Sequence, residues 1–204
     1  GRHDHTATRM QDSRVLVVGG YNAQGSPEST AEVYDPATNT WTLLQTLYAH
    51  GVQHTATLLA DGRVLVVGGC GAGTCTGEAE LFDPFTNTFT PAAPIDTPAA
   101  SHVAVLLEDG RVLAAGGTLP GGGALLYDPS TNAWIPTGAM LTQHAQAAGI
   151  KLVDGRVLVA GGITISDTPS VLTSVEIYDP STDTWSPAAD LSQPRYAHNL
   201  ALLP

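Results

Sequence analysis

Four histidines occupy the same position in a pattern that recurs along the chain. His5, His54 and His102 each lie seven residues before the aspartate of a turn, and His198 takes the equivalent place near the C-terminus. Imidazoles that converge on one site could bind copper or another transition metal. The alternative is that each histidine packs between neighbouring repeats. Repetition favours packing, and the fourth repeat departs from the pattern with Ala147 here and His144 three residues earlier.

Two cysteines, Cys70 and Cys75, flank a glycine-rich stretch. A zinc site would need further ligands nearby. A C-x4-C pair in such a loop favours a local disulfide, with two free thiols as the alternative. The disulfide would indicate secretion or another oxidising extracytoplasmic compartment.

Other chemically capable residues also recur once per repeat. An arginine follows each turn, and a glutamate begins a strand in three repeats: Arg14, Arg63, Arg111 and Arg156; Glu32, Glu80 and Glu176. Carboxylates spread one per repeat do not form a close catalytic pair, so we interpret these residues as ion-pair or hydrogen-bond ties within a repeat. The glycine pairs lack the Lys and Ser/Thr of a phosphate loop, and no G-x-S-x-G motif occurs. We therefore predict no catalytic residue.

The elements that would hold these residues form a repeat of about 48 residues. Each unit has a glycine pair, then an aromatic-Asp-Pro triplet, then a bulky aromatic residue. The pairs lie at 19–20, 68–69, 116–117 and 161–162, the triplets begin at Tyr34, Phe82, Tyr127 and Tyr178, and the aromatic residues are Trp41, Phe89, Trp134 and Trp185. Such periodicity is typical of a repeat architecture.

Each unit predicts four antiparallel strands, as the second unit illustrates. An alternating strand over 54–59 leads to an Asp-Gly turn of type I′ and then to an apolar strand over 63–67, buried on both faces. A third strand over 79–82 ends at an Asp-Pro turn, and a short fourth strand follows at 89–90. A repeated four-stranded unit of this kind is a β-propeller blade.

The glycine pair, the Tyr-Asp-Pro triplet and the following Trp resemble the kelch repeat, in four copies over essentially the whole chain. The second unit departs with Phe82 and Phe89, and Leu125 replaces the strand glutamate in the third. The resemblance implies one all-β domain, a kelch-type β-propeller or a fragment of one. Its blades cover about 1–47, 48–96, 97–140 and 141–190.

Residues 192–204 repeat a first strand and are surplus to four blades. The resemblance suggests six or seven blades, so we expect a fragment of a larger propeller; a processed or engineered four-blade protein is the alternative. Because an unpaired strand needs partners, we expect self-association or pairing with missing blades. The sequence begins at Gly1 without a leader, which suggests a processed product or an excised piece without its signal peptide.

Charge and hydropathy exclude some partner classes. Eight Lys and Arg against nineteen Asp and Glu give a net charge of −11, with no basic run. We therefore expect neither nucleic acid nor an anionic membrane surface as a partner. No apolar run approaches the roughly 20 residues of a membrane span, so membrane insertion is not expected either.

The chain direction places the histidines, the glycine pairs and the variable loops on one face, opposite the short turns. We predict a non-catalytic binding scaffold whose loops contact a protein or glycan partner, with no cofactor. Ile163 and Ile165 either anchor the partner or pack against a neighbouring blade. The predicted contacts are Tyr21, Asn22, Gln24, Thr74, Thr76, Leu119, Ile163, Thr164, Ile165 and Asp167.

The alternative function also comes from the resemblance. Kelch-like propellers resemble the core of secreted copper-radical enzymes of the galactose and glyoxal oxidase type, whose site uses a Cys–Tyr cross-link, a second Tyr and His ligands. Both cysteines of this chain lie in one loop, so no ligand set can be mapped onto it. Sugar mutarotation, specifier activity and a structural repeat without a ligand remain further possibilities.

Overall fold

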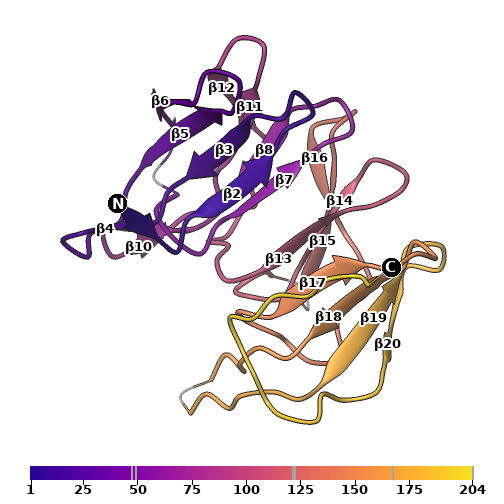
Figure 1. Ribbon diagram of the computed structural model, residues 1–204. Coiled ribbons are helices and arrows are strands. Elements are labelled where there is room, and N and C mark those ends of the chain that lie inside the picture. The colour runs from indigo at the N-terminus through magenta and orange to yellow at the C-terminus, as the bar shows by residue number, and fades with distance from the viewer. Residues whose placement is uncertain (47, 49, 121–122, 167, 204) are drawn as a thin grey trace. The chain divides into compact units, whose positions relative to one another are not determined.

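A computed structural model describes residues 1–46, 48, 50–120, 123–166 and 168–203. The described residues contain strands and turns but no helix, so none of them forms an apolar helix that could cross a membrane. Four sheets are four-stranded and antiparallel, with strands in sequence order from one edge to the other (Figure 1). The all-β, blade-type fold class is therefore confirmed.

The chain divides into two compact units, residues 1–100 and 101–204, with two blades in each. Blade 1 contains β2 (Thr6–Arg9), β3 (Val15–Val18), β5 (Thr30–Asp35) and β6 (Thr40–Gln45). Blade 2 contains β7 (Thr55–Leu58), β8 (Val64–Val67), β11 (Ala79–Asp83) and β12 (Thr88–Ala92).

In the second unit, blade 3 contains β13 (Val103–Leu106), β14 (Val112–Ala115), β15 (Ala124–Asp128) and β16 (Ala133–Pro136). Blade 4 contains β17 (Ala148–Lys151), β18 (Val157–Ala160), β19 (Val175–Asp179) and β20 (Thr184–Pro187). Two small hairpins in the first unit complete the list: β1 (Arg2–His3) with β4 (Tyr21–Asn22), and β9 (Cys70–Gly71) with β10 (Thr74–Cys75).

Each unit has a core between its two blades. In the first, Leu16, Val18, Ala31 and Val33 of blade 1 pack against Val64, Val66, Phe82 and Phe89 of blade 2. In the second, Leu113, Ala115, Ala124 and Leu126 of blade 3 pack against Val157, Val159, Tyr178 and Trp185 of blade 4. In blades 2 and 3 all four residues of the second strand are buried, on both faces of the sheet, which explains the continuous apolar run.

The turns between first and second strands differ from the predicted type I′. In blade 2, Gly62 N–H donates to Leu59 O and Leu59 N–H donates to Arg63 O, so three residues make the connection. Gly62 has a φ of +90°, and it alone among those three residues is left-handed. This is a type I turn followed by a left-handed residue, a G1 bulge. The type I′ prediction was wrong because it assumed a two-residue loop.

The C-terminal segment is not a strand in the described residues. Arg195 O accepts a hydrogen bond from Gly162 N–H, and Ala197 N–H donates to Gln146 O, just before β17 in the sequence. Between His198 and Leu203 the described backbone makes no further hydrogen bond. The tail therefore follows blade 4 as an unpaired extended segment.

Candidate functional site: the loop face

Within each unit, one face carries the ends of the second strands and the loops that follow them. The second strand of each blade runs back from the short turn, so its glycine pair and variable loop lie at the opposite end from that turn. We call this end the loop face and the other the turn face. The loop face carries the candidate binding residues.

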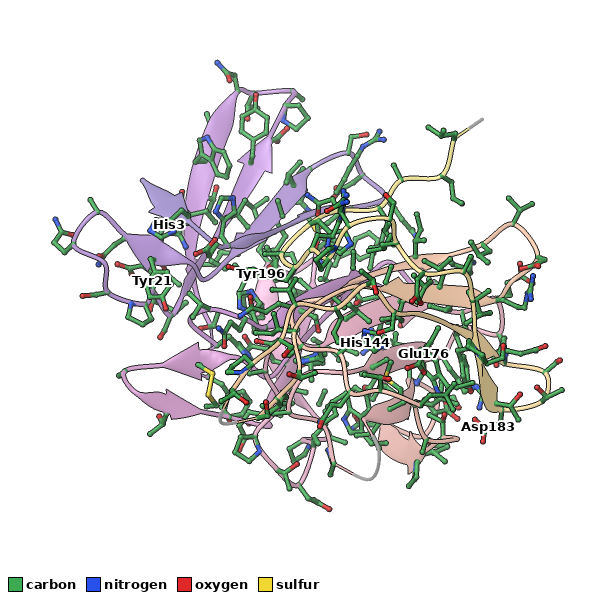
Figure 2. All side chains as sticks on the ribbon, turned by 90° about the horizontal axis from the view of Figure 1, so that it is seen from below. His3, Tyr21, His144, Glu176, Asp183 and Tyr196 are labelled. Atoms are coloured by element: carbon green, nitrogen blue, oxygen red, sulfur yellow. A yellow bond between two sulfur atoms is a disulfide. The ribbon has the colours of Figure 1, made fainter. Side chains whose placement is uncertain are left out.

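The loop after blade 1's glycine pair, over 21–30, is held by one asparagine. Asn22 Oδ1 accepts hydrogen bonds from the backbone N–H groups of Gln24 and Ser26, and its Nδ2 donates to Glu28 Oε1 at 2.7 Å. Tyr21 lies against His3, with ring centroids 5.3 Å apart (Figure 2). Of the three candidate contacts here, Asn22 organises the loop, whereas Gln24 leaves its side chain exposed.

The corresponding loop of blade 2 is a short hairpin closed by a disulfide. Cys70 pairs with Cys75 across β9 and β10, their Cα atoms are 3.9 Å apart, and their sulfurs are bonded (Figure 2). The predicted disulfide is confirmed. Because each sulfur is bonded to the other, neither is free for a cysteine–tyrosine cross-link. Thr74 is exposed at this tip, and Thr76 is partly buried beside it.

The second unit contributes a buried loop and an exposed one. Leu119 is buried, which leaves it little surface for a partner. In the loop over 163–174, Ile163 forms bridges to Ala145 and Val171, so it packs within its own unit. Ile165 is 49% exposed. Thr164 accepts the N–H of Ser170 at its Oγ1, and Asp167 lies outside the described residues.

Two of the recurring histidines, His54 and His198, contact the blade that precedes them. His54 Nε2 lies 2.9 Å from Thr6 Oγ1, and its ring covers Gly19 so closely that a Cβ there would lie 2.7 Å from Cε1. His198 covers Gly161 in the same way. Burial lowers the pKa of His102 to about 4. His5 is exposed. No group of three potential ligands among the described residues is arranged to hold a metal ion.

Three side-chain pairs on this face were missed at the sequence level, and two of them are buried. His50 donates from Nδ1 to Gly68 O at 2.7 Å and places Nε2 3.0 Å from Glu80 Oε1. His144 makes the same contacts with Gly161 O and Glu176, as Figure 2 shows for the second pair.

In blade 1, Arg2 takes the place of the histidine, bonding Gly19 O and Glu32. The strand glutamates are thus paired here, and not with the turn arginines. Those arginines pair with their own turn aspartates instead, as Arg63 does with Asp61 at 2.7 Å.

The glycine pairs receive the chain that enters the next blade. Gly20 N–H donates to Gly51 O, Gly117 N–H to His144 O and Gly162 N–H to Arg195 O, at 2.7 to 2.8 Å. A Cβ on Gly19 would lie 2.1 Å from Gly51 O, and one on Gly116 would lie 2.0 Å from His144 O. Since no side chain fits in that space, the first glycine is required by a close approach of two backbones.

Comparison with known proteins agrees with this architecture. The kelch motif family model matches residues 2–47, 54–95 and 149–192, more than half of the chain. An F-box/kelch-repeat protein of Arabidopsis thaliana is 44% identical over 46 residues, or 22% of this chain. That match spans only 12% of the plant protein.

Among solved structures, that of YjhT, a kelch-type propeller, superposes with a TM-score of 0.80 at 17% identity. The match covers 97% of this chain and 73% of that one. At this level of identity the likeness shows the shared fold.

Proposed function

Because this chain belongs to the kelch-repeat family, we propose that it is a non-catalytic interaction scaffold that binds a partner protein through its loop face. The observation that carries this proposal is the contrast between the two faces. Loops of different length and composition follow the glycine pairs, whereas the turn face repeats the same Asp-centred turns in every blade. Variable loops on a constant scaffold are where recognition is found.

The chemistry of the loop face fits a polar partner surface with one apolar anchor. Gln24, Thr74 and Thr164 offer uncharged hydrogen-bonding groups, and Ile165 offers an exposed branched side chain. Two of these three loops are fixed internally: Asn22 holds the loop with Gln24, and the disulfide closes the loop with Thr74. Such preorganised loops lose little conformational entropy on binding. Secretion is part of this proposal, supported by the disulfide.

The test compares matched substitutions on the two faces of the same unit. Ile165→Ser removes the anchor from the loop face, and Val153→Ser removes a 90%-exposed valine from the turn face. Proteins captured from an extracellular fraction by immobilised wild-type chain are identified, and their affinities for both variants are measured. We expect at least a tenfold loss for Ile165→Ser only. A loss confined to Val153→Ser would place the site on the turn face and refute the proposal.

A glycan array run with the same three proteins addresses the other partner class. Specific glycan binding that is lost in Ile165→Ser, with no protein partner captured, would replace the protein partner by a carbohydrate. Turnover of a bound sugar would contradict the non-catalytic role.

A further inference from the structure

The turn that joins the first and second strands places a reactive pair of residues in three of the blades. Its last residue is left-handed, with φ of +86° to +90°, a conformation that favours glycine. The residue before it is an aspartate, whose side chain accepts the backbone N–H two residues further on. The fold therefore brings the two residue types together for separate reasons. The pairs are Asp61–Gly62, Asp109–Gly110 and Asp154–Gly155.

An aspartate followed by glycine can rearrange its own backbone. The glycine nitrogen attacks the side-chain carboxyl carbon, a C–N bond forms, and the acid's hydroxyl leaves as water with the proton of the amide. The product is a five-membered succinimide ring. Water then opens the ring at either carbonyl, and one of the two openings gives isoaspartate, in which the chain runs through the former side chain. Glycine favours this attack because it has no side chain to hinder it.

In each of these turns the arginine that follows the glycine holds both oxygens of the carboxylate. Asp61 Oδ1 accepts the backbone N–H of Arg63 at 3.0 Å, and its Oδ2 accepts Nε–H at 2.8 Å. Arg63 Nη2 lies 2.7 Å from the same Oδ2. Arg111 and Arg156 hold their aspartates in the same way, with Nε–Oδ2 distances of 2.7 and 2.8 Å. The planar fork of arginine fixes the carboxylate, so any rotation of that group toward the glycine nitrogen breaks these bonds.

The same contacts keep the carboxyl group ionised. Burial raises the pKa of Asp61, but the hydrogen bonds and the charge of Arg63 outweigh burial, so this pKa is lower than usual. The hydrogen bond from the Arg156 side chain likewise lowers the pKa of Asp154. An ionised carboxylate resists a nitrogen nucleophile, and its oxygen cannot leave as water without a further proton. The arginine therefore keeps the reactive neutral acid scarce.

The glycine nitrogen has a hydrogen bond of its own, which does not involve the arginine. Gly62 N–H donates to Leu59 O, and Gly155 N–H donates to Leu152 O, each at 3.1 Å. Attack on the aspartate would break this bond as well. Because the two restraints use different groups, replacing the arginine side chain removes one of them and leaves the other in place.

Blade 1 carries the same clamp without the reactive pair. Arg14 Nε lies 2.7 Å from Asp12 Oδ2, and its Nη1 donates to Asn87 Oδ1 in blade 2 at 2.8 Å. Ser13 stands where the other three blades have glycine, and its side chain crowds the backbone nitrogen that would attack. Asp12 is therefore the slow site against which the other three are compared.

We propose that Asp61, Asp109 and Asp154 are latent isoaspartate sites, and that the arginine two residues after each keeps them unmodified in the folded chain. Modification would add one atom to the backbone path through the turn. In blade 2 that atom lies inside the loop closed by the bond from Leu59 N–H to Arg63 O, so the lengthened loop no longer fits the hairpin. This role is independent of what the loop face binds.

The test ages wild-type chain and Arg63→Gln side by side at 37 °C and pH 6. Isoaspartate at each position is quantified by mass-spectrometric peptide mapping. We expect isoaspartate at Asp61 to form at least fivefold faster in the variant. Asp109 and Asp154 of the same chains are internal controls and should keep their wild-type rates. Arg156→Gln is the reciprocal variant, in which the increase should move to Asp154.

Wild-type chain unfolded in 8 M urea gives the reference rate without any clamp. We expect the three Asp-Gly sites to react at least tenfold faster there than in the folded chain, and Asp12 to react more slowly than they do. Equal rates in folded and unfolded chain would mean that the fold protects none of these sites, which overturns the proposal.

Two results with the variants also overturn it. An unchanged rate at Asp61 in Arg63→Gln would show that the hydrogen bond of the glycine nitrogen protects the turn without the arginine. An equal rise at all three Asp-Gly sites would show that the substitution acts by loosening the whole fold.

Discussion

At the scale of single residues, the buried pair of His50 and Glu80 is the most sensitive point of blade 2. Removing one partner leaves the other buried without the group it faces at 3.0 Å, which costs roughly 3–5 kcal/mol. We expect Glu80→Leu to lower the free energy of unfolding by that amount in urea titrations. The double variant His50→Leu/Glu80→Leu should cost less, because blade 3 carries Leu125 at the same position.

Glu108 is exposed, so Glu108→Leu is the control for that experiment. It should change the free energy of unfolding by less than about 0.5 kcal/mol. A double variant as unstable as the sum of the two singles would show that the pair is not coupled.

His102 makes the stability of the chain depend on pH. Burial lowers its pKa from 6.5 to about 4 in the folded protein. Between these values the unfolded chain binds the proton and the folded chain does not, so stability falls as the pH falls from 6.5 to 4. The contribution is on the order of 3 kcal/mol.

Thermal melts at intervals across this pH range should show that the melting temperature declines less for His102→Gln than for the wild type. Equal declines in the two proteins would assign the pH dependence to other groups.

The buried pairs also show why some residues were missed from the sequence. Arg2 and His144 precede the first glycine of their pair by 17 residues, but His50 precedes Gly68 by 18. Gly51, with φ of +51°, absorbs the extra residue. One shifted position and the change from arginine to histidine hid the shared role. The signal available was the third repeat, which lacks both partners. Leu125 replaces its strand glutamate, and Pro98 and Ala99 stand where His50 and Arg2 stand in their own repeats.

At the scale of elements, the Asp-Pro turns depend on one left-handed residue each. Asn39 has φ of +55°, and its Oδ1 accepts a hydrogen bond from Tyr34 OH at 3.0 Å. We expect Asn39→Ala to cost about 1–2 kcal/mol, since alanine is strained in this conformation. Asn39→Gly should cost less because only the hydrogen bond is lost. Equal costs in chemical denaturation would mean that the conformation carries no strain.

The Cys70–Cys75 disulfide closes a short loop, so its effect on stability is modest. The loop-entropy relation gives about 2 kcal/mol for a loop of this length. Reduction and alkylation should lower the free energy of unfolding by that amount and leave the far-ultraviolet circular dichroism spectrum unchanged. Alkylation without reductant is the control, and labelling at that stage would show free thiols.

The elements that the sequence predicted well are those with the strongest periodic signal. The second strand of blade 2 was predicted over 63–67 and is found over Val64–Val67, so its end matches, because the glycine pair ends the apolar run. The hairpins β1–β4 and β9–β10 were missed, since two-residue strands are too short to show alternation. The turn type was missed because an Asp-Gly pair alone does not reveal a three-residue loop, which the bond from Leu59 N–H to Arg63 O shows in blade 2.

At the scale of the whole molecule, net charge opposes folding. The chain carries −11, so its charges repel one another in the compact state at low ionic strength. Salt screens this repulsion, with a Debye length of about 10 Å at 0.1 M. We expect the free energy of unfolding to rise between 20 and 300 mM NaCl, measured by urea titration. A fall over this range would instead show that ion pairs, such as Arg63 with Asp61, outweigh the repulsion.

The bond between each glycine pair and the following chain joins backbone to backbone. Its donor and its acceptor are present in every repeat whatever the side chains are, and the missing Cβ of the first glycine is its one requirement of sequence. Gene duplication can therefore add or remove a whole repeat without redesigning the junction. Unequal crossing-over would give a working joint at the first attempt, which makes blade number easier to change over evolution than the interior of any blade.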